Sequence, residues 1–173
     1  MVFRKRASSG RPQAPPPPAD PVGALDRSVV PGRLLGVVEA AVDADRRWHR
    51  VVETVQAGPL ADRLDVLGQQ IQAGVLELYA VAVRVGEIEG IIDALAPADA
   101  TAAFKAAKRR AADGDVVPEL DALEARFSSI QRLLNVMADA EEHLQVLDAR
   151  LLAAVARGAE LAVTADPRGL TTM

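Results

Sequence analysis

The chain has 173 residues with a formal net charge of −4, and half of them are hydrophobic. This length suits one domain, but aromatic residues make up only 3% of the chain, so we expect a thin, aliphatic core. The absence of cysteine excludes disulfide bonds and thiolate metal sites. No apolar stretch approaches the roughly 20 residues of a membrane span, and we expect a cytoplasmic protein without a cleavable signal.

Residues 1–31 are expected to form a disordered tail that is basic and rich in proline. The four successive prolines at 15–18 favour an extended polyproline II conformation and exclude a helix. Residues 1–20 have a net charge of +3, which leaves −7 for the rest of the chain. The basic residues of this tail are Arg4, Lys5, Arg6 and Arg11. We interpret the tail as a spacer, and the alternative is a ligand for a proline-recognition domain.

The body of the chain, residues 32–165, is expected to be a helical bundle. A first helix is predicted over residues 32–57, because apolar residues recur there with the helical period. Trp48, the only tryptophan of the chain, is expected to anchor this helix in the core, whereas Asp45 interrupts its apolar stripe. Gly58 and Pro59 separate this helix from the next, since glycine breaks a helix and proline suits a first helical turn.

The second helix, predicted from Pro59 to Ala96, carries the strongest pattern in the sequence. An apolar residue recurs at alternating steps of three and four, which is typical of a seam between helices in a left-handed coiled coil. The seam consists of Leu60, Leu64, Leu67, Ile71, Gly74, Leu78, Val81, Val85, Ile88, Ile92 and Leu95. Its central members are expected to be buried, namely Ile71, Leu78, Val85 and Ile88.

A second apolar stripe lies on roughly the opposite face of this helix and contains Leu76, Ala80 and Val83. A helix with two apolar faces needs two neighbours. We therefore expect either the first helix or a second copy of the chain to cover this stripe, and these three residues are candidates for binding a partner. Self-association is favoured, because the first helix is shorter and its own stripe contains Asp45.

Four glycines inside the second helix each cost roughly 1 kcal/mol relative to alanine. They are Gly68, Gly74, Gly86 and Gly90. Two interpretations remain open: another backbone approaches closely at Gly86 and Gly90, or the glycines make the second helix more flexible.

Two further helices are predicted after Pro97. A short one covers Ala100–Ala112, with Asp99 or Thr101 as its N-cap, and a long one runs from Pro118 or Glu119 to Val163. A disordered tail, residues 166–173, is expected to follow.

The long last helix carries its own seam, but the seam changes register. It begins with Leu120, Leu123, Phe127, Ile130, Leu134 and Met137. A strict heptad would next place Glu141 and Asp148 in the seam. A step of three residues to Ala140 instead restores an apolar seam of Leu144, Leu147, Leu151 and Ala154, and such a stammer locally overwinds a coiled coil.

The sequence contains no pattern typical of catalysis or metal binding. Its histidines are His49 and His143, and neither follows a glutamate at the three-residue spacing that ferritin-like metal bundles use. Motifs for an activated nucleophile and glycine-rich phosphate loops are absent. We therefore expect a protein that is not an enzyme and that has no metal, no cofactor and no small-molecule substrate.

The densest positive cluster of the body consists of Lys105, Lys108, Arg109 and Arg110. We interpret it as a solvated turn, because acidic residues flank it. The alternative is that this cluster, together with Arg4, Lys5 and Arg6, binds an anionic surface such as phosphates or lipid. Any such binding is expected to be weak and to be lost near physiological salt.

Together these patterns predict an all-α protein: an elongated, antiparallel, coiled-coil-like bundle of three main helices and one short one. The expected function is protein–protein interaction, as a scaffold, adaptor or assembly factor. The alternative is a peripheral membrane-associated or nucleic-acid-associated protein.

Overall fold

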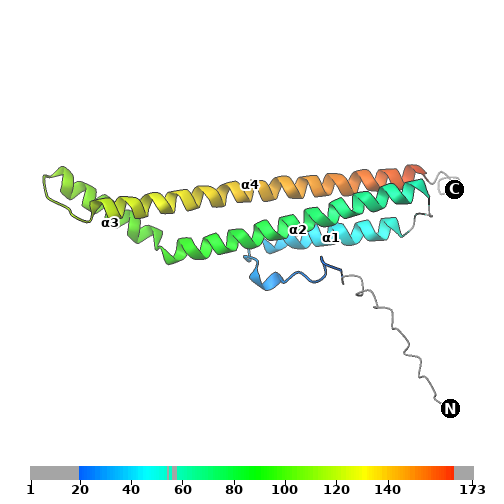
Figure 1. Cartoon of the computed structure of the whole chain (residues 1–173), viewed down its shortest axis with the longest axis horizontal. Helices are drawn as coiled ribbons and strands as arrows, with labels where there is room; N and C mark the ends of the chain where they lie inside the picture. The colour runs from blue at the N-terminus through cyan, green and yellow to red at the C-terminus, as the bar shows by residue number, and fades with distance from the viewer. Residues whose placement is uncertain (1–19, 54, 56–57, 166–173) are drawn as a thin grey trace, which may run out of the picture.

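A computed structural model describes residues 20–53, 55 and 58–165, and every regular element among them is helical, as predicted. A short 3₁₀ helix, η1 (Arg27–Val29), comes first. The α-helices that follow are α1 (Leu35–Val52), α2 (Pro59–Ala94), α3 (Pro97–Ala112) and α4 (Leu120–Ala165). At 1.5 Å per residue, α2 and α4 extend about 54 and 69 Å, which makes the molecule elongated (Figure 1).

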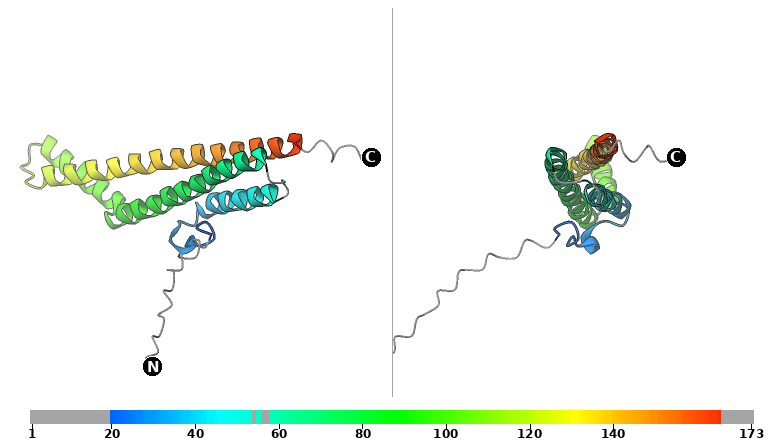
Figure 2. Two further views of the ribbon diagram at one scale, coloured as in Figure 1. Left: turned by 45° about the vertical axis from the view of Figure 1, so that its right-hand side comes forward. Right: turned by 90° about the vertical axis from the view of Figure 1, so that its right-hand side faces the viewer.

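Three of these helices enclose the core. Helices α2 and α4 lie side by side, and α1 packs against both of them (Figure 1). Viewed end-on, the three form a triangle with α2 at one corner, and the segment before α1 lies across its base (Figure 2). Helix α3 packs against α4 at the opposite end of the molecule from the start of α2.

The predicted seam of α2 supplies much of the core. Its members Ile71, Leu78, Val85 and Ile88 are all buried, which confirms the expectation from their spacing. Val75 and Ala82 are buried as well. The buried face of α2 is wider than one seam because this helix packs against both α1 and α4.

In α4 the buried residues follow the shifted register. Leu144, Leu147 and Leu151 are buried, as the three-residue step at Ala140 predicts. Leu151 reaches Gly74 of α2, where its Cδ1 lies 3.8 Å from the position that a Cβ would occupy. The contact places a gap in the α2 seam opposite a large side chain of α4.

The predicted N-terminal tail is wrong for residues 20–31, which fold against the bundle. Val22 and Val30 belong to the core, with 1% and 5% of their surface exposed. Asp26 caps η1 by accepting a hydrogen bond from the Ser28 backbone N–H at 2.9 Å. The rest of that tail, residues 1–19, and the predicted C-terminal tail lie outside the described residues.

The first helix is shorter than predicted at both ends. It begins at Leu35 rather than Gly32, because the backbone N–H of Leu34 donates to the Pro31 carbonyl at 2.8 Å and a turn precedes the helix. It ends at Val52 rather than at residue 57. Helix α2 begins at Pro59, as predicted, and ends two residues before Ala96.

The third helix begins at Pro97, earlier than the predicted Ala100. Ala96 has a positive φ of 45° and reverses the chain, and Pro97 occupies the first helical turn. The two predicted N-caps, Asp99 and Thr101, therefore both lie inside α3 and do not cap it, which makes that prediction wrong. The start of α4 is within two residues of its predicted position, and its end at Ala165 lies two residues beyond Val163.

Candidate interaction surfaces

Arg33 lies just before α1 and links the start of this helix to both long helices, α2 and α4. Its Nε donates to Glu89 Oε1 of α2 at 2.8 Å, and its Nη1 lies 2.6 Å from Glu141 Oε1 of α4. The hydrogen bond to Glu89 is the main reason that the pKa of the Arg33 guanidinium is raised. We call these three residues the Arg33 clamp. Sequence analysis missed it, because its members are far apart in the chain.

The residues before α1, 20–34, lie along α2 and are called the N-terminal strap. The hydroxyl of Tyr79 donates to the Asp26 carbonyl at 2.9 Å. Gly86 faces the Pro31 ring, and a Cβ at Gly86 would lie 3.0 Å from Pro31 Cγ. Close approach therefore explains Gly86, whereas Gly90 has no such neighbour within 4 Å.

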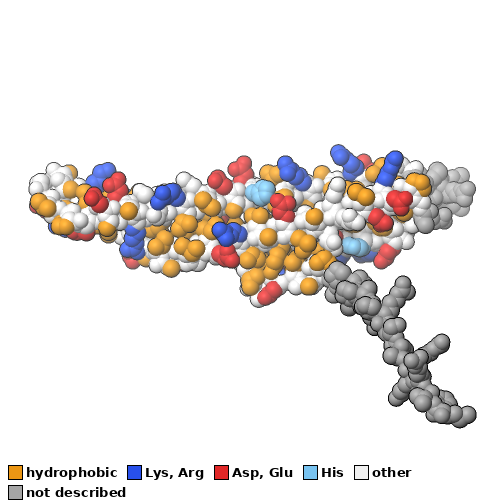
Figure 3. Space-filling view, viewed as in Figure 1, with side chains coloured by type: hydrophobic (Ala, Val, Ile, Leu, Met, Phe, Trp, Pro, Cys, Tyr) orange, Lys and Arg blue, Asp and Glu red, His pale blue; other side chains and the backbone are white. Residues whose placement is uncertain are grey.

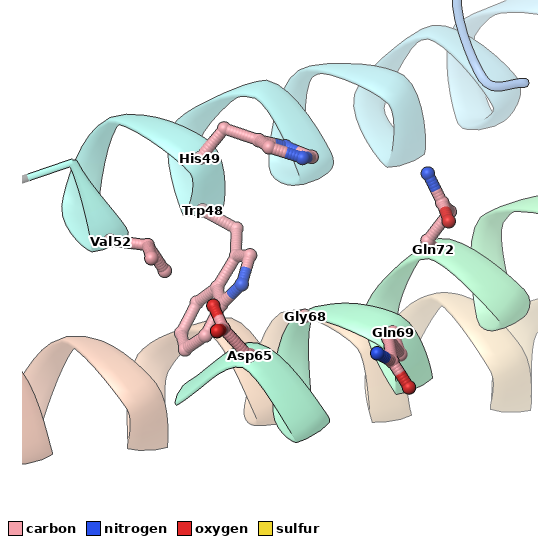
Figure 4. Close-up of a pocket in the computed structure, with 7 residues that line it drawn as sticks. All are labelled: Trp48, His49, Val52, Asp65, Gly68, Gln69 and Gln72. Carbon is pink, nitrogen blue, oxygen red and sulfur yellow. The ribbon is translucent and has the colours of Figure 1, made fainter. Parts of the chain in front are cut away.

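Trp48 joins α1 to both long helices and is 1% exposed, which confirms its predicted role as a core anchor. It extends from α1 toward α2 at Gly68, where a Cβ would lie 2.6 Å from the indole Nε1 (Figure 4). Gly158 of α4 lies against the same ring. A surface hollow borders this contact and is lined by Trp48, His49, Val52, Asp65, Gly68, Gln69 and Gln72.

Asp45 is a buried carboxylate in the apolar face of α1, with 2% of its surface exposed. Its Oδ1 has no hydrogen-bond partner among the described residues, and its Oδ2 lies 3.4 Å from His49 Nδ1. Burial raises the pKa of Asp45, and the nearby His49 partly opposes this effect. Asp45, which was predicted to interrupt the apolar stripe of the first helix, thus lies inside the core.

The two histidines lie on different helices. His143 Nε2 is 3.5 Å from Glu77 Oε1, and both side chains are about half exposed. Within the part of the chain that the structure describes, no cluster of three or more His, Asp or Glu residues is arranged to hold a metal ion.

The second predicted stripe of α2 lies opposite its seam, and two of its members, Leu76 and Val83, still pack in part against the core. We define the outward stripe as Val66, Ala73, Leu76, Ala80, Val83 and Ile91. Ala80 is exposed, and Leu76 and Val83 are half-buried. Val66 and Ile91 near its two ends are 56% and 51% exposed. Apolar side chains gather over this part of the molecule (Figure 3).

Helix α1 and the N-terminal strap leave part of the outward stripe uncovered, since Ala73 and Ala80 are exposed. Trp48 and the N-terminal strap contact α2 at Gly68 and Gly86, which lie about a quarter turn from the centre of the stripe at 100° per residue. The core therefore covers the stripe in part, at Leu76 and Val83, and the choice between the two predicted covers stays a prediction. The exposed members, Val66, Ala73, Ala80 and Ile91, are left to solvent or to a partner.

The four residues of the predicted basic cluster lie on α3 and make different contacts. Arg110 pairs with Asp115 at 3.6 Å and with Glu119 at 3.5 Å. Lys108 Nζ lies 5.9 Å from the centre of the Phe104 ring, and that ring stacks on Phe127. Lys105 and Arg109 border a second surface hollow, lined also by Ala98, Thr101, Ala102 and Ala106. The other predicted cations, Arg4, Lys5 and Arg6, lie outside the described residues.

Comparison with known proteins reveals no relative, since no family model, no curated protein and no solved structure matches the chain. Among the helices of the described region, none combines the length and apolarity needed to cross a membrane.

Proposed function

We propose that this chain is a non-enzymatic cytoplasmic protein that binds other proteins through helical apolar faces, as a scaffold, adaptor or assembly factor. We further propose that its bundle is antiparallel and coiled-coil-like. The outward stripe supports this function. It consists of apolar residues along a long helix whose opposite face is already fixed in the core, so a partner helix can be added without unfolding the bundle.

The packing of α2 supports the same conclusion. The centre of the stripe offers alanine at Ala73 and Ala80, where a second helix can approach closely. Groove binding by an amphipathic helix uses apolar residues spaced by three and four, which is the spacing of the stripe.

A pull-down from the native host tests the proposal with two matched variants. Ala80→Glu places a charge on the outward stripe, and Ala153→Glu places the same charge on an exposed position of α4. We expect Ala80→Glu to lose protein partners that the natural chain and Ala153→Glu both retain. Identical capture by all three chains would contradict a role for this face.

A second function, binding to an anionic surface, has narrower support. Lys105, Lys108 and Arg109 are exposed and make no ion pair within the described region. Each contributes roughly 1 kcal/mol near an anionic membrane, so these three charges alone give weak attachment. Flotation with anionic vesicles at low and physiological salt tests this function, with Lys105→Gln/Arg109→Gln as the variant. Binding that persists at physiological salt and is lost in the variant would favour it.

A further inference from the structure

The four central residues of the outward stripe have a regular order of side-chain sizes. From Ala73 the small and large residues alternate: Ala73, Leu76, Ala80 and Val83. Beyond them, Gln69 on one side and Glu87 on the other continue the alternating steps of three and four. All these positions therefore lie on one face of α2.

This order makes the stripe complementary to itself when two copies are turned end for end. In a two-fold interface, a contact from one residue to another is repeated in reverse. With the axis midway between Leu76 and Ala80, Leu76 faces Ala80 of the partner subunit, and Ala73 faces Val83 of the partner subunit. Each layer then pairs a small side chain with a larger one, which fills the space evenly.

Charge favours the same arrangement. In the end-for-end pair, Glu87 faces Gln69 of the partner subunit, whose amide N–H can donate to the carboxylate. In a parallel pair, Glu87 faces Glu87 of the partner subunit, and the two carboxylates repel each other, because the exposed pair of each with Arg84 of its own helix, at 3.5 Å, is weak. A parallel pair also stacks alanine on alanine and leucine on leucine, so its layers alternate between gaps and crowding.

We infer that the occupant of the outward stripe is a second copy of this chain, with the two α2 helices antiparallel about an axis between Leu76 and Ala80. This inference rests on the proposed function and identifies its partner. The triangle of α1, α2 and α4 leaves the outer corner at α2 open to such a contact (Figure 2). The seam of α2 stays buried in each copy because it lies on a different face, and Leu76 and Val83, which pack in part against the core, offer only their exposed sides to the partner.

Sedimentation at micromolar concentration tests the dimer. We expect the natural chain and Ala153→Glu to sediment as dimers, and Ala80→Glu to sediment as a monomer with the same helical content by circular dichroism. A natural chain that is monomeric throughout would overturn the inference. The proposed function is judged separately, by whether Ala80→Glu changes capture of other proteins.

Cysteine crosslinking tests the direction of the helices, since the natural sequence has no cysteine. Gln69 and Glu87 are separated by about 27 Å along α2, too far to bond within one chain. In the antiparallel dimer, Gln69→Cys/Glu87→Cys forms disulfide-linked dimers, whereas Gln69→Cys alone and Glu87→Cys alone do not. Efficient crosslinking of either single variant would show a parallel pair, and the absence of crosslinking in all three would overturn the proposed interface.

Discussion

The indole of Trp48 occupies the space that a side chain would need at Gly158: a Cβ there would lie 1.9 Å from the ring carbon Cζ3. The same ring leaves only 2.6 Å for a Cβ at Gly68. Glycines on α2 and α4 thus form a slot that admits the largest side chain of α1. The rigid ring has no flexible end that could move aside.

We therefore expect Gly158→Ala to destabilise the protein by about 1–3 kcal/mol or more, because it overpacks this slot. Gly90→Ala is the control: it lies within a helix and has no neighbour within 4 Å, so alanine should stabilise the fold by about 0.5–1 kcal/mol. Urea unfolding measures both changes, and fluorescence of the single tryptophan reports whether α1 has left the slot. Equal effects of the two substitutions would contradict the packing of Trp48.

Truncation of the α2 seam should be costly at its centre. Leu78 is fully buried, so Leu78→Ala is expected to cost about 2–5 kcal/mol through lost burial and a cavity. Leu152→Ala on α4 removes the same atoms from a residue that is 47% exposed and should change stability by about 0.5 kcal/mol or less. Thermal melts compare the two, and a melting temperature unchanged in Leu78→Ala would show that the seam is not buried.

The buried Asp45 predicts an unusual dependence of stability on pH. Its folded-state pKa is raised, so the unfolded chain releases this proton more readily, and stability falls as pH rises from the ordinary aspartate pKa through the raised one. Asp45→Asn removes the charge and should stabilise the protein at pH 7, with the gain shrinking in acid.

Asp43→Asn is the control for Asp45→Asn, because it removes a carboxylate from an exposed position of the same helix. Melting temperatures measured from acid to neutral pH test the difference. A gain that stays constant with pH would show that the Asp45 charge is not its cause.

Loss of the Arg33 clamp should release the N-terminal strap more than it lowers global stability. The side chains of Arg33, Glu89 and Glu141 are between 34% and 42% exposed, so their ion pairs contribute about 1 kcal/mol or less each. In Arg33→Gln we expect faster hydrogen exchange at the amides of Val30 and Leu34, which donate within the strap. Arg84→Gln, which breaks an exposed pair with Glu87, is the control. Equal protection in both variants would contradict the clamp.

The long helices could be predicted because their evidence is local and repeated. Regular steps of three and four place Ile71, Leu78 and Val85 on one face whatever the partner is. The three-residue step at Ala140 follows from the same geometry, since a charged residue would otherwise lie among apolar neighbours.

The position of α1 and the strap could not be predicted from such periodicity. It depends on contacts between distant residues, such as Trp48 with Gly158 and Arg33 with Glu141. Gly158 has no local signal of its own, because a single glycine in a helix is equally consistent with a turn, a flexible point or a packing slot. The outward stripe was found from the sequence, but which of its members are exposed became clear only when α1 had been placed.

The Arg33 clamp also marks a mechanical boundary. On one side of it, α1 braces α2 and α4 along their length, and bending the rod there would strain packing on all three. On the other side, α2 and α4 continue without that brace, and the chain turns at Ala96 into α3. The distal end is therefore expected to bend more easily, since the α2 residues of the buried core cluster end at Val85. A load applied at the α3 tip would bend the rod near Glu89 and Glu141 and leave the tryptophan slot undisturbed.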